Sequence, residues 1–311
     1  ASEDEGLLND GQYGSRPNRS AHDPVFIEEI QSEICRVSRK SNVKFDNNAT
    51  SCYDRILPAF ASIASQKFGI HKNVAFVMAS TLQECKYKLK TLLGVSEDYY
   101  THCKIYPIYG TGQGSGNSPA IWCIISSVLF DCHTSRAHGA TFESPDRTQT
   151  ITFYMIGFVD DSTGQANAFL LDTQPHAEHL VERMREDAQL WNDLLWASGG
   201  ASELAKCTYH VIDYAFTPDG APILRGGQVG SDIILQTGDR TSQQTIPFKS
   251  AHCSHKTLGH YKAPSGNQTR QYQVLIEKSN DAGTFVQCSA LNWKEAWSYY
   301  FAIYLPSIGY P

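Results

Sequence analysis

The stretch of sequence that decides the fold is ITFYMIGFVDD, residues 151–161. Its apolar run predicts a β-strand that ends at two adjacent aspartates, Asp160 and Asp161, before a Ser-Thr-Gly turn. Two carboxylates at contact distance repel each other unless a cation lies between them. Mg²⁺ prefers carboxylate, phosphate and water oxygens, so the pair indicates a divalent-metal site at a hairpin tip. Polar turn chemistry is the alternative for FVDD taken alone.

Two further segments lie upstream of this pair. GTGQGSGNSPAIW, residues 110–122, is a Gly-rich loop that leads into a predicted helix near 119–136. Ser118 suits the N-cap of that helix and Pro119 its first position. Glycines such as Gly114 let a backbone approach a base pair closely, and Gln113 can hydrogen-bond without adding charge. The second segment is FDNNATSCYDRI, residues 45–56.

In this order and spacing, the three segments resemble the palm motifs of reverse transcriptases, which are RNA-directed DNA polymerases. In that family the first motif has a catalytic Asp, followed five positions later by Phe or Tyr and then Asp. The resemblance implies that Tyr53 is a steric gate, with its ring lying under the sugar and excluding a ribose 2′-hydroxyl. It also implies contacts to template and incoming nucleotide from Gln113, Gly114, Ser118 and Pro119.

The first motif departs from the family at its metal ligand. Counting back five residues from Tyr53 reaches Asn48, whose neutral carbonyl oxygen is a weaker Mg²⁺ ligand than a carboxylate. Asp46 lies on the same strand face but roughly 6 to 7 Å away along the strand. It could replace the missing carboxylate only through a bulge or a register shift. The predicted ligands of two Mg²⁺ or Mn²⁺ ions are therefore Asp160, Asp161, Asp46 and Asn48, with the second ion held weakly.

Three shorter matches extend the resemblance. QYGSRPNRSAHD, residues 12–23, is similar to a fingers segment in which Arg16 and Arg19 take nucleotide-facing positions. Lys206 matches a lysine that can protonate the leaving pyrophosphate, and Leu258 with Gly259 falls where the primer-grip hairpin is expected. A surface lysine and a strand-end Leu-Gly are the plainer alternatives.

The order of predicted elements indicates an α+β protein, with an antiparallel sheet and helices on one face. Predicted helices span 24–39, 55–68, 71–92 and 176–196, predicted strands span 43–48, 148–159 and 163–171, and the tail from residue 267 is mainly helical. The apolar spacing of the first helix is Val25, Ile27, Ile30, Ile34 and Val37. The resemblance implies a polymerase right hand, with partial fingers in 1–44, a palm in 45–262 and the start of a helical thumb or connection in 263–311. A start without Met and the missing earlier fingers strands fit a fragment.

Composition sets limits on location and partners. No apolar run is long enough to span a bilayer and no signal peptide is evident, so we expect an intracellular protein without a membrane partner. The nine cysteines are scattered without a CxxC pair and read as reduced core thiols. His252, Cys253 and His255 cluster, but no second pair at zinc-finger spacing accompanies them.

Charge gives a mixed indication about nucleic acid. The net charge of −6 argues mildly against binding it, yet residues 239–278 hold six Lys or Arg against two acids. The leading prediction is a retroelement reverse transcriptase that extends a primer on an RNA or DNA template with dNTPs. The alternative is an impaired reverse-transcriptase-like protein that binds nucleic acid without extending it. The oligomeric state stays open.

Overall fold

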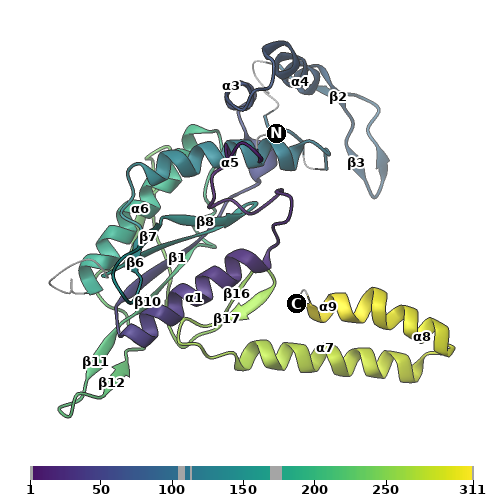
Figure 1. The fold of residues 1–311 in the computed structure, drawn as a ribbon. Helices are drawn as coiled ribbons and strands as arrows, with labels where there is room; N and C mark the ends of the chain where they lie inside the picture. Colours follow the sequence, from purple (N-terminus) through teal and green to yellow (C-terminus); the bar gives the residue numbers. More distant parts are fainter. Residues whose placement is uncertain (1–2, 104–108, 113, 169–176, 310–311) are drawn as a thin grey trace.

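A five-stranded sheet lies at the centre of the computed structural model, which describes residues 3–103, 109–112, 114–168 and 177–309 (Figure 1). The strand order is β15-β10-β1-β9-β8, and only the β10–β15 pair is parallel. The strands are β1 (Asn42–Asn48), β8 (Met155–Phe158), β9 (Asp161–Asn167), β10 (Thr208–Ile212) and β15 (Phe248–Ser250). The predicted α+β class and its largely antiparallel sheet are confirmed.

Helices α5 (Ser118–Thr134) and α6 (Ala177–Ala197) pack over one face of the sheet and against each other. Strand β1 alternates, so Val43 and Phe45 point into a core that includes Leu180 and Met184 of α6. Phe130 of α5 stacks on Trp191 of α6 at a centroid distance of 5.0 Å. Helices α5 and α6 therefore form a helical layer on one face of the sheet, as predicted.

Helix α1 (His22–Ser38) covers the opposite face of the sheet, together with the hairpin of β16 (His255–Thr257) and β17 (His260–Lys262) (Figure 1). The apolar spacing of this helix is only partly buried, because Val25 alone among its spaced apolar residues Val25, Ile30, Ile34 and Val37 is buried. Ile30, Ile34 and Val37 are 42%, 37% and 69% exposed, whereas Glu28 is buried. The sheet beneath this helix presents the polar side chains of β1, so a polar face of α1 is the complementary one.

The remaining elements surround this core. On one side lie α2 (Cys52–Arg55), α3 (Pro58–Lys67), α4 (Lys72–Glu84) and the short strands β2 (Lys86–Tyr87), β3 (Lys90–Thr91), β4 (Gly94–Val95) and β5 (Tyr100–Thr101). Short hairpins are formed by β6 (Ala140–Glu143) with β7 (Thr150–Phe153), β11 (Tyr214–Phe216) with β12 (Pro222–Leu224), and β13 (Ile234–Gln236) with β14 (Gln243–Thr245). The predicted helix over 71–92 thus ends at Glu84, and the predicted strand over 148–159 is divided at Tyr154.

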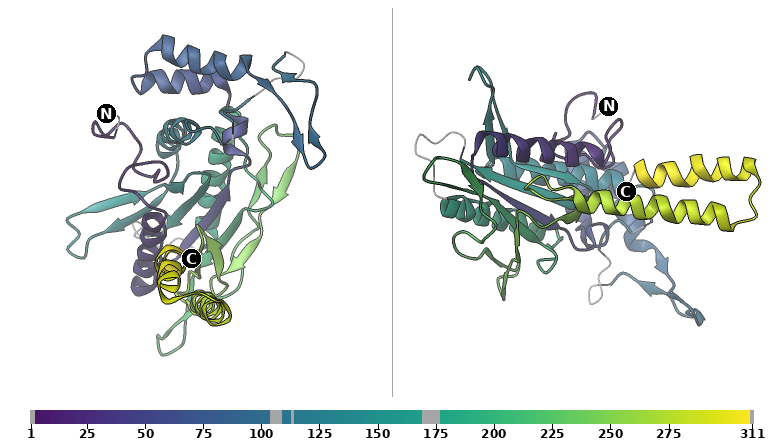
Figure 2. Two further views of the ribbon diagram at one scale, coloured as in Figure 1. Left: turned by 90° about the vertical axis from the view of Figure 1, so that its right-hand side faces the viewer. Right: turned by 90° about the horizontal axis from the view of Figure 1, so that it is seen from below.

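The C-terminal helices project away from the sheet (Figure 2). They are α7 (Thr269–Cys288), α8 (Trp293–Tyr299), a π-helical turn (Tyr300–Tyr304) and α9 (Leu305–Gly309), and α9 packs back on α7. The prediction of a mainly helical tail is confirmed. None of the helices in the described ranges combines the length and the apolarity needed to cross a membrane.

The cysteines divide by burial, and none of the nine is in a disulfide. Four are buried (Cys35, Cys52, Cys123 and Cys207), four are exposed (Cys103, Cys132, Cys253 and Cys288), and Cys85 is half-buried. The prediction of core thiols is therefore wrong for the exposed four. Burial raises the pKa of Cys35 to about 11 and that of Cys52 to about 12, which suppresses their reactive thiolates.

Thiol titration should reproduce this division. With Ellman's reagent at pH 8, we expect the four exposed cysteines to react first, the half-buried one more slowly, and the buried four only after denaturation. A native protein in which all nine thiols react in one fast phase would contradict the burial described above.

Candidate functional site

The two motifs that carry acidic or amide side chains meet where β1 ends and β9 begins. Asn48 is the register partner of Asp161, and its Nδ2 donates a hydrogen bond of 2.9 Å to Asp161 Oδ1. Asp160 lies in the adjoining turn, and its backbone oxygen accepts a bond from the backbone N–H of Ala49 at 3.2 Å. The sheet therefore brings together residues separated by more than a hundred positions in the sequence.

The FVDD turn is held in an unusual backbone conformation. Val159 has a φ of 58°, in the left-handed region that a β-branched residue rarely adopts. Its carbonyl accepts a 2.6 Å hydrogen bond from Trp122 Nε1 of α5. Gly14 lies so close that a Cβ added there would be 2.5 Å from the Val159 nitrogen. Strained residues persist where their surroundings enforce them and cluster at functional sites, so this turn is a candidate for one.

The N-terminal segment braces this turn from the sheet edge. Tyr13 N–H donates to the Gly157 carbonyl and Gly157 N–H donates to the Gly11 carbonyl, each at 2.8 Å. Gln12 thus forms a parallel bridge with Gly157 of β8. The segment that resembles the fingers therefore lies directly against the strand that carries FVDD.

The electrostatics of Asp161 favour a cation. Burial raises the pKa of Asp161, the bond from Asn48 lowers it, and the neighbouring Asp160 raises it again. Among the described residues, no Lys or Arg forms an ion pair with either aspartate. The pKa of Asp161 is therefore raised mainly by burial, and the charge of Asp160 adds to this effect.

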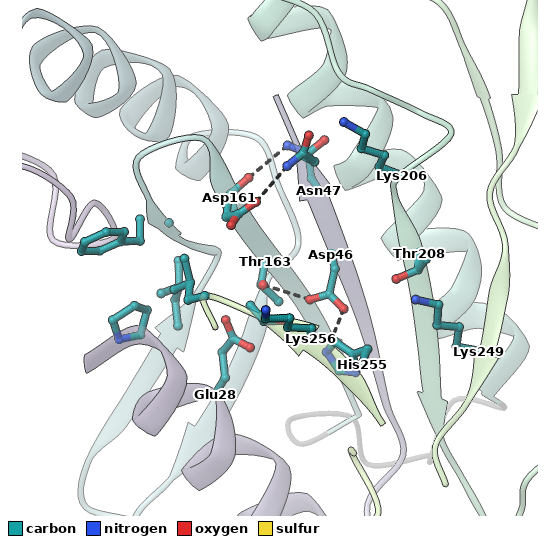
Figure 3. Close-up of a pocket in the computed structure, with 18 residues that line it drawn as sticks. Glu28, Asp46, Asn47, Asp161, Thr163, Lys206, Thr208, Lys249, His255 and Lys256 are labelled. Atoms are coloured by element: carbon teal, nitrogen blue, oxygen red, sulfur yellow. Dashed lines mark hydrogen bonds and ion pairs between the residues drawn. The ribbon is translucent and has the colours of Figure 1, made fainter. Parts of the chain in front are cut away.

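Two adjoining hollows open at this point. One of about 420 Å³ is lined by Asn48, Tyr53, Asp160, Glu203 and Lys206, with neighbours from residues 49–54. The other, of about 150 Å³, is lined by Asn48, Asp161, Lys206 and Leu258 among others, and Figure 3 draws its lining. Asn48 and Lys206 belong to both, so six residues predicted to serve catalysis or nucleotide binding line the two hollows: Asp46, Asn48, Tyr53, Asp160, Asp161 and Lys206.

Asp46 lines the 150 Å³ hollow but is not brought to the FVDD tip. Strand β1 pairs with β9 without interruption from Asn42 to Asn48, so the bulge or register shift that would bring Asp46 to FVDD does not occur between these strands. Asp46 Oδ1 instead accepts a 3.0 Å hydrogen bond from Thr163 Oγ1 (Figure 3). The same oxygen lies 3.3 Å from Lys44 Nζ. Burial would raise the pKa of Asp46, but the charge of Lys44 and nearby histidines hold it well below its usual value.

The Gly-rich loop is tied to the first motif. Thr111 N–H donates to the Tyr53 carbonyl at 2.7 Å, and burial raises the pKa of the Tyr53 hydroxyl. Ser118 is the first residue of α5 rather than its N-cap, which is Asn117, so Pro119 falls one position later than predicted. The Ser118 hydroxyl bonds back to the carbonyls of Thr111 and Gly112. Gly114 has a φ of 92°, and Gln113 lies outside the described residues.

The two arginines of the N-terminal segment have other partners. Arg16 is buried, and its guanidinium bonds twice to Glu3 at 2.8 and 2.7 Å and also to two backbone carbonyls. The guanidinium donors of Arg16 are thus used within the protein and do not face a nucleotide. Arg19 lies over the ring of Tyr13 at 5.0 Å and remains partly exposed.

Leu258 and Gly259 form the two-residue turn between β16 and β17, with φ angles of 50° and 84°. The primer-grip role of this hairpin stays a prediction, and Leu258 lines the 150 Å³ hollow together with Lys249 and Lys256. Two other basic side chains of residues 239–278 form ion pairs within the protein. Lys262 contacts buried Glu28, and Arg240 lies 2.6 Å from Asp193.

Several buried polar residues were missed by sequence reasoning, namely Glu28, Lys44 and His210. Alternation along β1 placed polar residues on one face, which is the usual pattern of a strand whose polar face meets solvent. Nothing in the sequence showed that α1 and a distant hairpin cover that face.

Comparison with known proteins gives structural neighbours only. No protein-family model and no curated protein matches the chain. Among solved structures it is similar to apo telomerase from Candida tropicalis truncated from the C-terminal domain, with 11% identity, a TM-score of 0.41 and coverage of 76% of this chain and 41% of that chain. Telomerase from the same organism with a TWJ fragment of telomeric RNA gives 11% identity, a TM-score of 0.43 and coverage of 82% and 33%. Telomerase from Candida albicans with a TWJ fragment of telomeric RNA gives 10% identity, a TM-score of 0.45 and coverage of 96% of this chain and 42% of that chain. The chain therefore spans less than half the length of each of these telomerases.

Proposed function

We propose that this chain is the catalytic core of a reverse transcriptase, performing template-directed transfer of deoxynucleotides to a primer. The carrying observation is that Asn48 and Asp161 are register partners beside Asp160, in one recess with Tyr53 and Lys206. The palm motifs of the chain resemble those of retroelement reverse transcriptases, and we propose a retroelement origin.

The reaction would be an in-line attack by a primer 3′-oxygen on the α-phosphate of a dNTP, and each residue of the recess would have a separate role in it. Asp160 and Asp161 would hold Mg²⁺ or Mn²⁺, with the Asn48 carbonyl as a third oxygen. When bound, these ions neutralise the attacking and leaving oxygens. The donor set fits one ion well and a second poorly, because it has two carboxylates and an amide in the recess.

The remaining side chains bind and orient the substrates. The Tyr53 ring would lie under the sugar and exclude a 2′-hydroxyl, and Lys206 Nζ would give a proton to the departing pyrophosphate oxygen. Lys249 and Lys256, which line the recess, would contact the phosphate backbone of the template-primer. The Leu258–Gly259 turn would support the primer end.

Primer extension tests the proposal directly. On poly(rA)/oligo(dT) with Mg²⁺ or Mn²⁺, we expect weak incorporation of dTTP by the chain and none by Asp160→Ala, since that change removes one of two carboxylates from the recess. Equal signals from both proteins would show that the activity does not come from this site.

Asn48 also supports a second candidate function, which is binding of a primer-template without extension. A chain whose metal ligand has become an amide can retain the fold and the basic side chains and still bind a primer-template. This reading expects salt-dependent binding of the duplex, with affinity falling as ionic strength rises, and no incorporation with either cation.

A further inference from the structure

We propose that Asp46, His210 and His255 form a binding site for one divalent first-row transition ion, with Zn²⁺ as the preferred occupant. The three side chains come from β1, β10 and β16, and Asn48, Asp160 and Asp161 are not among them. The inference does not depend on the proposed polymerase function, because it rests on different side chains.

The separations of the two histidine nitrogens from Asp46 Oδ2 suit such an ion. Asp46 Oδ2 lies 3.5 Å from His210 Nε2 and 3.2 Å from His255 Nε2, and the atoms offered by the three residues all lie within 4.8 Å of one another. Zinc bonds to imidazole nitrogen and carboxylate oxygen are about 2.0–2.2 Å long, so ligand atoms of a tetrahedral site are about 3.3–3.5 Å apart. Figure 3 shows Asp46 and His255 directed toward each other.

The contacts of Asp46 with His210 and His255 do not have the geometry of hydrogen bonds. Asp46 Oδ2 and both ring nitrogens of each histidine are buried without a hydrogen-bond partner among the described residues. His210 is 0% and His255 is 6% exposed, so neither ring is solvated. Ligands around a shared ion point at its centre and not along the edges that join them, which explains short separations without hydrogen-bond alignment. An unsatisfied buried polar group is costly, and an ion would satisfy three atoms at once.

The chemistry of the three side chains matches that of transition-metal ligands. Imidazole with carboxylate is a donor set suited to Zn²⁺ and poorly suited to Mg²⁺, which prefers oxygen.

The surroundings leave room for a fourth ligand and balance the charge. Asp46 and His255 both line the 150 Å³ hollow, from which water or an anionic oxygen could complete the coordination. The nearby Lys44 lies 2.6 Å from Glu28 and 3.3 Å from Asp46 Oδ1, so its charge faces both carboxylates. An ion here would join the β16–β17 hairpin to the central sheet and fix the Leu258–Gly259 turn over the recess.

Metal titration tests the site without using polymerase activity. The full chain, treated with chelator and dialysed, should take up one equivalent of Zn²⁺, and Co²⁺ should give the visible bands of a four-coordinate nitrogen-oxygen site. His255→Gln should weaken binding at least about 100-fold, because even groups behind the ligands cost 10- to 100-fold. Asp160→Ala should still bind one equivalent, which separates this result from failure of the proposed function.

His252→Gln is the matched control, because His252 is exposed and only three residues from His255. It should bind Zn²⁺ like the unchanged chain. Circular dichroism of each variant verifies folding. Asp46→Asn is a second variant that should lose Zn²⁺ binding, for use if a change at His210 unfolds the protein. Absence of stoichiometric uptake, or equal uptake by His255→Gln, would overturn the proposal and leave the histidines as buried neighbours of Asp46.

Discussion

Replacing Asn48 by aspartate is expected to raise primer extension by about 100-fold or more. The change restores a carboxylate at the position that pairs with Asp161 across β1 and β9. Metal stabilisation of the transferring phosphoryl group is worth several kcal/mol, and each 1.36 kcal/mol is about a tenfold change in rate. Initial rates of dTTP incorporation at several Mg²⁺ concentrations measure the effect, and the Mg²⁺ needed for half the maximal rate should fall.

The same substitution makes a second prediction that does not depend on turnover. In Asn48→Asp the hydrogen bond from the amide to Asp161 is replaced by repulsion between carboxylates, so without divalent ions the protein should be less stable. Mg²⁺ should then raise the melting temperature of Asn48→Asp more than that of the unchanged chain, because binding to the folded state stabilises it.

Asn48→Asp combined with Asp160→Ala is the control for both readouts. It should lose the gain in incorporation and most of the gain in Mg²⁺-dependent stability. If Asn48→Asp alone changes neither the rate nor the response to Mg²⁺, Asn48 is not the position that limits metal binding.

The part of the fold that sequence predicts best is the part built from strong local patterns. Helix α6 was predicted at 176–196 and spans Ala177–Ala197, because its apolar residues repeat at the helical period over its whole length. The FVDD tip and β1 were also placed correctly, and motif order predicted that they share a recess. These features need no knowledge of what lies on the far side of the sheet.

Tertiary context decided the rest. The periodicity of α1 was real, yet its apolar residues are largely exposed, and the buried positions include Glu28 because charged side chains of β1 lie beneath it. Asp46 could be expected near Asn48 by strand geometry, but its partners His210 and His255 come from strands far along the chain. Long-range pairing of buried polar groups leaves no local pattern from which it could be predicted.

The polar layer beneath α1 leads to the largest expected effect on stability. Glu28 is only 3% exposed, lies 2.6 Å from Lys44 Nζ and forms an ion pair with Lys262 as well. Burial raises the pKa of Glu28, but the two lysines outweigh it and keep the carboxylate ionised. Glu28 thus contacts two buried ammonium groups, from β1 and β17, and Asp46 contacts the first of them as well.

Glu28→Gln should therefore destabilise the chain by about 3–5 kcal/mol, since removal of one partner leaves buried charge without compensation. Urea unfolding measures the change as a lower midpoint with an unchanged slope. Glu29→Gln is the matched control, because its carboxylate is partly exposed and lies 3.7 Å from His260, a surface pair worth about 0–1 kcal/mol.

Adding Lys262→Met to Glu28→Gln should recover part of the loss, because one uncompensated charge is replaced by apolar packing. The two changes should then be less destabilising together than the sum of their separate effects, as expected for residues in direct contact. A Glu28→Gln variant as stable as Glu29→Gln would mean that the lysines find other partners, and that this layer does not hold α1 and the β16–β17 hairpin to the sheet.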